Sequence, residues 1–172
     1  VMLIRSQNVL VGKFNFDDVA FITDAVNQTM QRSELKDLDV LLNITGASIG
    51  RSHFVPIDFQ KANVNQHVCA LRIKNKSVGK SFFVSSFLNS YDGQKQIKKL
   101  LGSSNREGLN YQQIREINIP IPNIEDDSEF KRIYDVLISA ANYISTEEKK
   151  LSKLQSLKTG LMQDLLSGKV RV

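Results

Sequence analysis

The sequence has little of what stabilises or activates many small proteins: among its 172 residues there are one cysteine, two histidines, three prolines and no tryptophan. Cys69 alone cannot form an internal disulfide, which suits a reducing compartment. Together with His53 and His67 it offers too few ligands for an ordinary zinc site, so we expect no metal or other cofactor. No apolar run reaches the roughly 18 residues that a membrane span needs, so we expect no membrane partner.

Motifs for common enzyme chemistry are also missing. No G-x-G-x-x-G follows a strand, and no metalloprotease or nucleophile-elbow motif occurs. Gly46–Ser52 resembles a phosphate loop but is one residue short and carries arginine in place of lysine; a turn that needs glycine is the better interpretation. The triplet Asn118–Pro120 is not the motif of an amino-methyltransferase. Nothing in the sequence therefore argues for an enzyme.

The positive charge of the chain lies in one central segment. The net charge is +5, yet residues 1–50 carry a net charge of −2 and the charges from residue 125 onward cancel. Residues 51–115 hold eleven basic and three acidic residues. Such a cluster is typical of a surface that binds a polyanion, above all nucleic acid. A solvated basic surface without a ligand is the alternative.

The first 123 residues predict a mixed α/β domain. Short apolar runs alternate with turn residues, and Asn110 with Gln113 forms a capping box at the start of a helix. The segment from Ile117 to Pro122 is extended, because each proline pushes the preceding residue out of the helical region. We expect strands over Asp39–Thr45 and Val64–Lys74, and short helices over Ser81–Ser90 and Gly93–Leu101, with Cys69, Phe82, Phe83 and Phe87 in the core.

Residues 124–172 predict one long helix with an apolar stripe. No proline occurs up to Leu166, and apolar residues recur with the heptad spacing of a coiled coil. About 60 Å of helix is too long to be covered by a small domain, so a second helix must cover the stripe; a helix folded back over its own domain is the alternative. The polar residues Glu147 and Lys158 interrupt the stripe. Its apolar members are Phe130, Ile133, Leu137, Ala140, Ile144, Leu151, Leu154, Leu161 and Leu165.

Several stretches in this order resemble the specificity subunit of type I restriction-modification systems. The match covers nearly the whole chain, and the set is more specific than any single stretch. Leu38–Leu42 followed by Gly46–Arg51 resembles a strand and glycine turn of that family. Leu157–Lys169 is very similar to the end of the family's long helix. Further similar segments are Leu3–Val9, Ala62–Val68 and the run from Gly102 through Leu109 to Pro122.

The resemblance implies an α+β fold: a mixed α/β target recognition domain (residues 1–123, with its N-terminal part missing) followed by one long C-terminal coiled-coil helix (residues 124–172). It also implies a half-subunit, natural or excised, that is not catalytic and that reads one half of a bipartite target in double-stranded DNA in the cytoplasm. The implied protein partners are methyltransferase (modification) subunits, a motor-nuclease (restriction) subunit in the full complex, and a second copy, through antiparallel helices. A coiled-coil assembly module without specific DNA binding is the alternative function.

Candidate DNA contacts follow from side-chain chemistry, because arginine, asparagine and glutamine read base edges while lysine contacts phosphates. For base edges we expect Arg106 and Asn105 first, then Arg51, His53 and Lys61. For phosphates the candidates are Lys95, Lys98 and Lys99, together with Lys74, Lys76 and Lys80. Asn65, Gln66 and His67 are expected on a strand, where facing DNA and bonding the neighbouring backbone are the two alternatives; Gln66 is predicted to fix a neighbouring loop.

Overall fold

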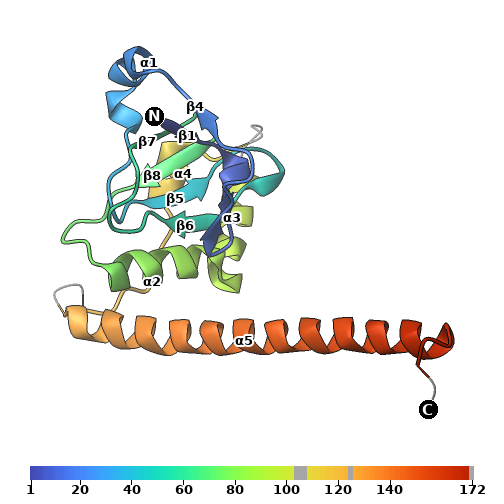
Figure 1. Ribbon diagram of the computed structural model, residues 1–172. Helices are drawn as coiled ribbons and strands as arrows, with labels where there is room; N and C mark the ends of the chain where they lie inside the picture. The colour runs from blue at the N-terminus through green and yellow to red at the C-terminus, as the bar shows by residue number, and fades with distance from the viewer. Residues whose placement is uncertain (103–107, 124–125, 171–172) are drawn as a thin grey trace. The chain divides into compact units, whose positions relative to one another are not determined.

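The computed structural model describes residues 1–102, 108–123 and 126–170 (Figure 1). The strands are β1 (Met2–Ile4), β2 (Val9–Leu10), β3 (Lys13–Phe14), β4 (Ala20–Phe21), β5 (Val40–Asn43), β6 (Ser52–Phe54), β7 (Ala62–Val64) and β8 (Val68–Leu71). The helices are α1 (Asp24–Thr29), α2 (Val78–Asn89), α3 (Tyr91–Gly102), α4 (Tyr111–Arg115) and α5 (Asp127–Leu166). The described residues also form short 3-10 turns, η1 (Ser6–Asn8), η2 (Gln31–Ser33) and η3 (Gly46–Ser48). This is the predicted mixed α/β domain followed by a long helix.

Within the described ranges, the strands form two three-stranded sheets and one hairpin. In the first sheet β1 lies between β4, which is antiparallel to it, and β7, which is parallel to it. In the second sheet β5 lies between β6 and β8, both antiparallel. β2 and β3 pair as an antiparallel hairpin. All four residues of β5 are buried, so this strand is the centre of the domain.

The apolar run of β5 is continuous because the strand is covered on both faces. Successive side chains of a strand point to opposite faces. Leu41 packs into one core, with β1, β7 and β8, while Val40 and Leu42 pack into a second core with α2, α3 and α4. A strand buried on both faces carries apolar residues at successive positions rather than at alternate ones. The predicted strand over Asp39–Thr45 is thereby confirmed in its central four residues.

The predicted strand over Val64–Lys74 is instead two strands joined by a turn. β7 ends at Val64 and β8 begins at Val68. Between them the Asn65 side chain accepts a hydrogen bond from the His67 backbone N–H (3.1 Å), and the Val68 N–H donates to the Asn65 carbonyl. An asparagine that bonds the backbone two residues on makes a local turn. Asn65 therefore performs the loop-fixing role that was predicted for Gln66, which is exposed.

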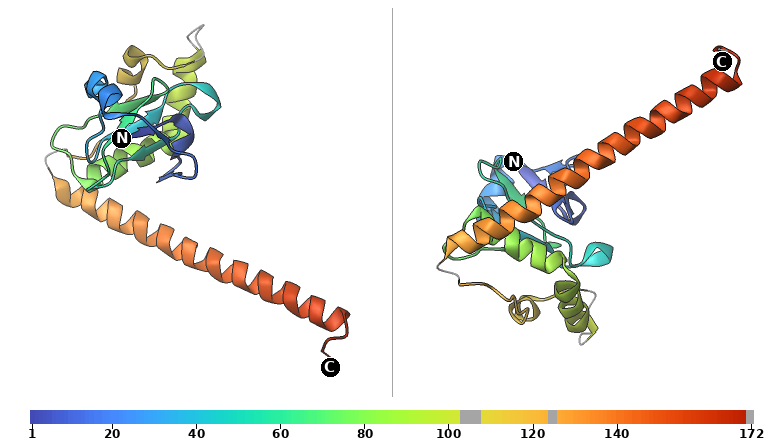
Figure 2. Two further views of the ribbon diagram at one scale, coloured as in Figure 1. Left: turned by 45° about the horizontal axis from the view of Figure 1, so that its top comes forward. Right: turned by 90° about the horizontal axis from the view of Figure 1, so that it is seen from below.

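Helices α2, α3 and α4 cover one face of the β6–β5–β8 sheet (Figures 1 and 2). The predicted helices Ser81–Ser90 and Gly93–Leu101 are confirmed, each beginning two or three residues earlier in the structure. The predicted capping box is present, because Asn110 and Gln113 bond each other's backbone N–H at 2.9 and 3.0 Å. Cys69 is buried as expected. The aromatic rings of α2 are only half-buried, which corrects their assignment to the core: these are Phe82, Phe83 and Phe87.

The first turn of α5 packs onto α2. Phe130 is 1% exposed and its ring meets that of Phe83 edge-on, with 5.5 Å between centroids. A Cβ added at Gly79 would lie 2.9 Å from the Phe130 backbone, so only glycine admits this approach. Phe130 is therefore core and is not available to a partner helix, which corrects its place in the predicted stripe. For the same reason the compact units divide at Lys131 and Arg132, eight residues after the boundary that the sequence suggested.

From Arg132 onward α5 is a single unbroken helix (Figure 2). Ile133 is half-buried. The remaining apolar stripe positions are all exposed, and they are Leu137, Ala140, Ile144, Leu151, Leu154, Leu161 and Leu165. In the part of the chain that the structure describes, no helix is long and apolar enough to cross a membrane.

Candidate nucleic-acid interface

The turn that follows β5 presents Arg51 on its outer side. Gly46 and Gly50 both have positive φ (72° and 88°), which confirms the prediction of a turn that needs glycine. The Asn43 N–H donates to the Arg51 carbonyl (2.9 Å), and the Arg51 N–H donates to the Ser48 carbonyl (3.1 Å). The main chain on both sides of Arg51 is thus tied to the central strand and to its own turn.

Two amide side chains hold this turn from the helices. Asn89, the last residue of α2, accepts from the Ser52 N–H (3.0 Å) and donates to the Ser52 carbonyl (2.8 Å). Gln94 of α3 donates to the Gly50 carbonyl (2.9 Å), and a Cβ added at Gly50 would lie 2.7 Å from its Oε1 atom. The residues on either side of Arg51 are therefore fixed, while the Arg51 side chain is exposed and has no partner among the described residues.

The predicted lysine stripe lies on α3 beside this turn. Successive residues of a helix are about 100° apart, so Lys98, Lys95 and Lys99 follow Gln94 at about 40°, 100° and 140° around the axis. Gln96, at about 200°, bonds both backbone groups of Asn118 on another side of the helix. The three lysines are exposed, and within the described ranges they have no ion-pair partner. They form a cationic strip that begins at the Gln94–Gly50 contact.

Other cations of the central segment serve the fold instead. Arg72 bonds both oxygens of the fully buried Asp39 carboxylate (2.9 and 2.6 Å), and this hydrogen bonding raises the pKa of the guanidinium. Lys80 is 5% exposed and pairs with Asp127 at 2.8 Å, so its assignment to phosphate contact is wrong. Lys76 donates to the Asp37 carbonyl (2.5 Å). The surplus charge of residues 51–115 therefore overstates what the surface offers to an anion.

Asp127 ties the start of α5 to α2. Besides the Lys80 pair, its Oδ1 atom accepts from the Ser77 hydroxyl at 3.0 Å. The hydrogen bonds from Lys80 and then from Ser77 lower the pKa of this carboxyl. Ser77 is itself the N-cap of α2. The start of α5 is thus held by a buried lysine that the sequence did not single out as structural.

His53 lies in β6, two residues after Arg51, and Lys61 lies farther along the chain, before β7. His53 is half-buried between the rings of Phe14 (5.0 Å between centroids) and Phe54 (5.2 Å). Its burial lowers the pKa to about 4, so the ring is neutral at pH 7. Lys61 precedes β7 in the other sheet, exposed, with its Nζ atom 4.0 Å from Glu34. The His53 ring is therefore next to Arg51 in the chain but packs against phenylalanine rings, whereas Lys61 precedes a strand of the other sheet.

The two residues that the sequence ranked first for base reading, Asn105 and Arg106, lie outside the described residues. The chain that follows them is described: Gly108 bridges Thr45, and the Leu109 N–H donates to the Ile44 carbonyl (2.8 Å). The Thr45 hydroxyl also contacts Nδ1 of His67 (2.6 Å). Thr45 directly precedes the turn that carries Arg51. The segment after residue 107 is thus anchored at the same end of β5 as that turn.

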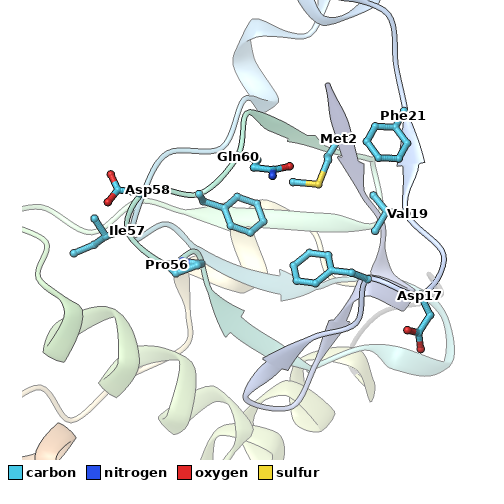
Figure 3. Close-up of a pocket in the computed structure, with 10 residues that line it drawn as sticks. Met2, Asp17, Val19, Phe21, Pro56, Ile57, Asp58 and Gln60 are labelled. Atoms are coloured by element: carbon cyan, nitrogen blue, oxygen red, sulfur yellow. The ribbon is translucent and has the colours of Figure 1, made fainter.

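A separate apolar groove of about 610 Å³ opens near the N-terminus (Figure 3). Phe16, Phe21 and Ile57 line it and are each more than half exposed. It shares no residue with the arginine turn or with the lysine strip. No sequence pattern predicted this groove, because its exposed apolar residues lie in loops and in one short strand and follow no period. Among the described residues, no group of three or more His, Cys, Asp or Glu side chains is placed to hold a metal.

The sequence of this chain matches a known family of DNA-specificity domains. Residues 5–156 match the family described as the type I restriction modification DNA specificity domain. The match covers most of the chain, and the chain belongs to this family. Its role is therefore DNA specificity in a type I restriction-modification system.

Two curated relatives agree with this assignment. The specificity subunit of the type I restriction enzyme MjaVIII of Methanocaldococcus jannaschii is 26% identical over 175 residues, which span all of this chain and 40% of that protein. The specificity subunit of the type I restriction enzyme EcoBI of Escherichia coli is 26% identical over 171 residues, which span 97% of this chain and 34% of that protein. The chain thus spans well under half the length of these relatives.

Proposed function

We propose that this chain reads one half of a bipartite sequence in double-stranded DNA, with Arg51 at base edges and Lys95, Lys98 and Lys99 at phosphates. Arginine matches the acceptor pair of guanine, and lysine acts as a point charge toward the backbone. The chain performs no catalysis in this proposal: methylation and cleavage belong to the modification and motor-nuclease subunits of the complex.

The observation that carries the proposal is the contrast between the Arg51 main chain and its side chain. Gln94 holds the residue before it and Asn89 holds the residue after it, yet its guanidinium is exposed and unpaired among the described residues. A recognition residue needs this arrangement, because a fixed backbone lowers the entropy that is lost when the side chain binds. The adjacent strip on α3 supplies the positive charge that positions a duplex.

The exposed stripe of α5 is proposed to pair with the α5 helix of a second copy in antiparallel orientation and to dock the modification subunits. A two-fold pair of recognition domains would read an inverted repeat, because two-fold protein symmetry requires two-fold symmetry of the DNA. The exposed apolar residues of α5 are the support for this step, since an apolar stripe of this length needs a cover.

The experiment is selection from a randomised duplex pool, followed by binding titrations on the selected sequence. Arg51→Ala is expected to lose about 1–3 kcal/mol on the selected sequence and to relax the preference at one position. Lys98→Ala is expected to weaken all sequences alike and to lower the slope of log K against log salt by about 1. Lys149→Ala, on the exposed surface of α5, is the matched control.

Three outcomes would decide the assignment. If no sequence is enriched, the chain is an assembly module and the proposal fails. If a sequence is enriched but Arg51→Ala binds it unchanged, the reading residue lies elsewhere, and Arg106→Ala becomes the next variant. If Asn89→Ala, which removes both hydrogen bonds to Ser52, relaxes the preference in the same direction as Arg51→Ala, the turn acts through its fixed main chain.

A further inference from the structure

The stripe of α5 is interrupted by two residues of opposite charge, Glu147 and Lys158. In heptad terms Leu137, Ile144, Leu151, Lys158 and Leu165 occupy the a positions. The d positions are Ile133, Ala140, Glu147, Leu154 and Leu161. Glu147 is partly exposed and Lys158 is exposed. A charged residue in such a stripe disfavours every pairing that leaves it against apolar side chains, and it thereby selects the register of the pair.

We infer that α5 pairs antiparallel with a second copy in the register that places Glu147 of each copy opposite Lys158 of the other. The inference rests on the proposed function for the pairing itself and adds the register and its cause. An antiparallel coiled coil sets a positions against d positions, and this register satisfies that rule at every layer. Its other layers place Leu151 against Leu154, Ile144 against Leu161, and Ala140 against Leu165.

Neighbouring registers lack this complementarity. Shifted one heptad in one direction, Glu147 faces Leu151 and Lys158 faces Ala140. Shifted one heptad in the other direction, Glu147 faces Leu165 and Lys158 faces Leu154. Either shift buries all four charges of the dimer against apolar side chains, which costs free energy that only a paired arrangement recovers. The charges of the stripe are therefore complementary to those of a second α5 helix that runs in the opposite direction.

The present partner of Glu147 does not compete with this pairing. Glu147 contacts Lys150 of the same helix at 2.8 Å, and both side chains are substantially exposed. An exposed pair of this kind contributes little to stability, because solvent screens it. Glu147 can therefore exchange Lys150 for Lys158 of a second copy, or contact both, because a carboxylate accepts several hydrogen bonds.

The register also fixes a length. Its two-fold axis passes between Ser152 and Lys153, so each Lys131 lies about 32 Å from that axis along the helix, and the two copies of Lys131 lie about 65 Å apart along the pair. A shift of one heptad would change this separation by about 10 Å. Because B-DNA advances about 3.4 Å per base pair, a change of about 10 Å corresponds to about three base pairs.

Charge reversal in the full chain tests the inference, with the dimer constant measured by sedimentation equilibrium. Glu147→Lys places a lysine opposite Lys158, and Lys158→Glu places a glutamate opposite Glu147; each is expected to weaken the dimer at least about tenfold. The double variant Glu147→Lys/Lys158→Glu is expected to recover the wild-type dimer constant.

Mixing the two single variants is expected to yield the heterodimer, in which one cross-helix layer joins the two native residues and the other joins the two substituted ones. Lys149→Glu, on the outer face, is the control and is expected to leave the dimer constant unchanged.

The charges of the heterodimer are complementary at both cross-helix layers. The Glu147→Lys chain carries lysine at both stripe positions, and the Lys158→Glu chain carries glutamate at both. Each cross-helix layer of the mixed pair therefore sets a lysine against a glutamate, and both layers are attractive. In either single variant alone, both layers set like charges together.

Recovery by the double variant can arise only across helices. Residue 158 is eleven positions from residue 147, beyond the three or four residues that meet on one helix, so it cannot repair a local charge conflict with Lys150. Helix content measured by circular dichroism shows that each variant folds. The register would be overturned, while dimerisation stands, if the double variant dimerises as weakly as the single variants. It would also be overturned if the two single variants do not form a heterodimer.

Cysteine pairs provide a second, independent measure of register. Ile144→Cys/Leu161→Cys is expected to oxidise to a covalent dimer, whereas Ile144→Cys/Leu154→Cys, which matches a one-heptad shift, is not. Cys69 does not interfere, because its burial raises the pKa of the thiol to about 11 and leaves almost no thiolate. A wild-type chain that stays monomeric at high concentration would overturn the second copy as the partner, and DNA binding by the same chain would show that the proposed reading function survives.

Discussion

The domain (Val1–Lys131) and the helix beyond it (Arg132–Val172) treat the same residue types in opposite ways. In the domain Leu41 is fully buried and Phe130 is 1% exposed, whereas in the helix Leu151 and Leu154 are 55% and 63% exposed. Both regions are rich in apolar residues at regular spacing. The domain buries two apolar cores by itself and leaves only local apolar surface, such as the groove near its N-terminus, exposed. Among the described residues, the apolar stripe of the helix has no such cover.

The charged residues show the same contrast. In the domain Asp39 is fully buried and bonded to Arg72, and Lys80 is buried and paired with Asp127. In the helix Glu147 is paired locally, with Lys150. Buried polar groups need partners within the same fold, while exposed ones remain available to another molecule. Spacing alone therefore does not tell an interior stripe from an interface.

The largest expected effect contrasts two members of the same apolar stripe. Phe130→Ala removes a ring packed in the domain and is expected to cost about 3–5 kcal/mol of domain stability. Ile144→Ala, in the exposed part of the stripe, is expected to leave domain unfolding unchanged and to weaken the dimer. Denaturant unfolding and sedimentation equilibrium measure the two effects. Equal losses of domain stability would mean that the division at Lys131 and Arg132 does not separate two functions.

The next effect separates a cation of the fold from a cation of the surface. Arg72→Ala leaves the buried Asp39 carboxylate without its charged partner and is expected to destabilise the domain by about 2–3 kcal/mol. Lys74→Ala, two residues later and exposed, serves as the control and is expected to change stability by less than about 0.5 kcal/mol. Thermal unfolding of both variants at pH 7 is the measurement. A stable Arg72→Ala domain would show that Asp39 is satisfied by its backbone donor at Lys36.

The smallest effect concerns pH. The folded domain holds the pKa of His53 at about 4, below its ordinary value of 6.5, because the ring is buried. Between these values the unfolded chain binds a proton that the folded domain does not, so stability is complete above about pH 6.5 and falls as the pH drops toward 4. We expect a loss of about 1–2 kcal/mol from this group, because solvent reaches part of the ring and screens the effect.

His53→Phe keeps an aromatic ring beside Phe14 and cannot be protonated. The variant is therefore expected to lose less stability than the wild type as the pH falls from about 6.5 toward 4, measured by urea titrations. If the stability of the two proteins falls equally with pH, the His53 ring is in contact with solvent and is again a candidate for base contact.

Much of the fold was predictable because its signals are local. The strand at β5, the helices α2 and α3, the capping box at Asn110 and the length of α5 all follow from neighbouring residues, since propensity, capping and periodicity act over a few positions. The exposure of Lys95, Lys98 and Lys99 followed from the same helical spacing. The split between β7 and β8 was not predictable. The run of branched residues favours one continuous strand, and the hydrogen bond from His67 to Asn65 that makes the turn is known only from the structure.

The candidate site was predictable only in part. Arg51 was identified from its chemistry beside a glycine turn, but nothing in the sequence connects it to Asn89 and Gln94, which hold the residues on either side of it from about forty positions away. The structural roles of Lys80 and Arg72 could not be predicted for the same reason, since the sequence does not distinguish a lysine that binds phosphate from one that binds Asp127. Partners distant in the chain leave no periodic signal.

By itself, the sequence determined the class of fold, the single long helix with its apolar stripe, and the order of charges along that stripe, because each of these depends on residues close together in the chain. Tertiary structure alone decided that Phe130 belongs to the core, packed against Gly79 and Phe83, while the rest of the stripe does not. It also decided which of the described cations are unpaired and can bind an anion. The physical reason is that burial and ion pairing depend on neighbours in space, and folding selects those neighbours from segments that local patterns do not link.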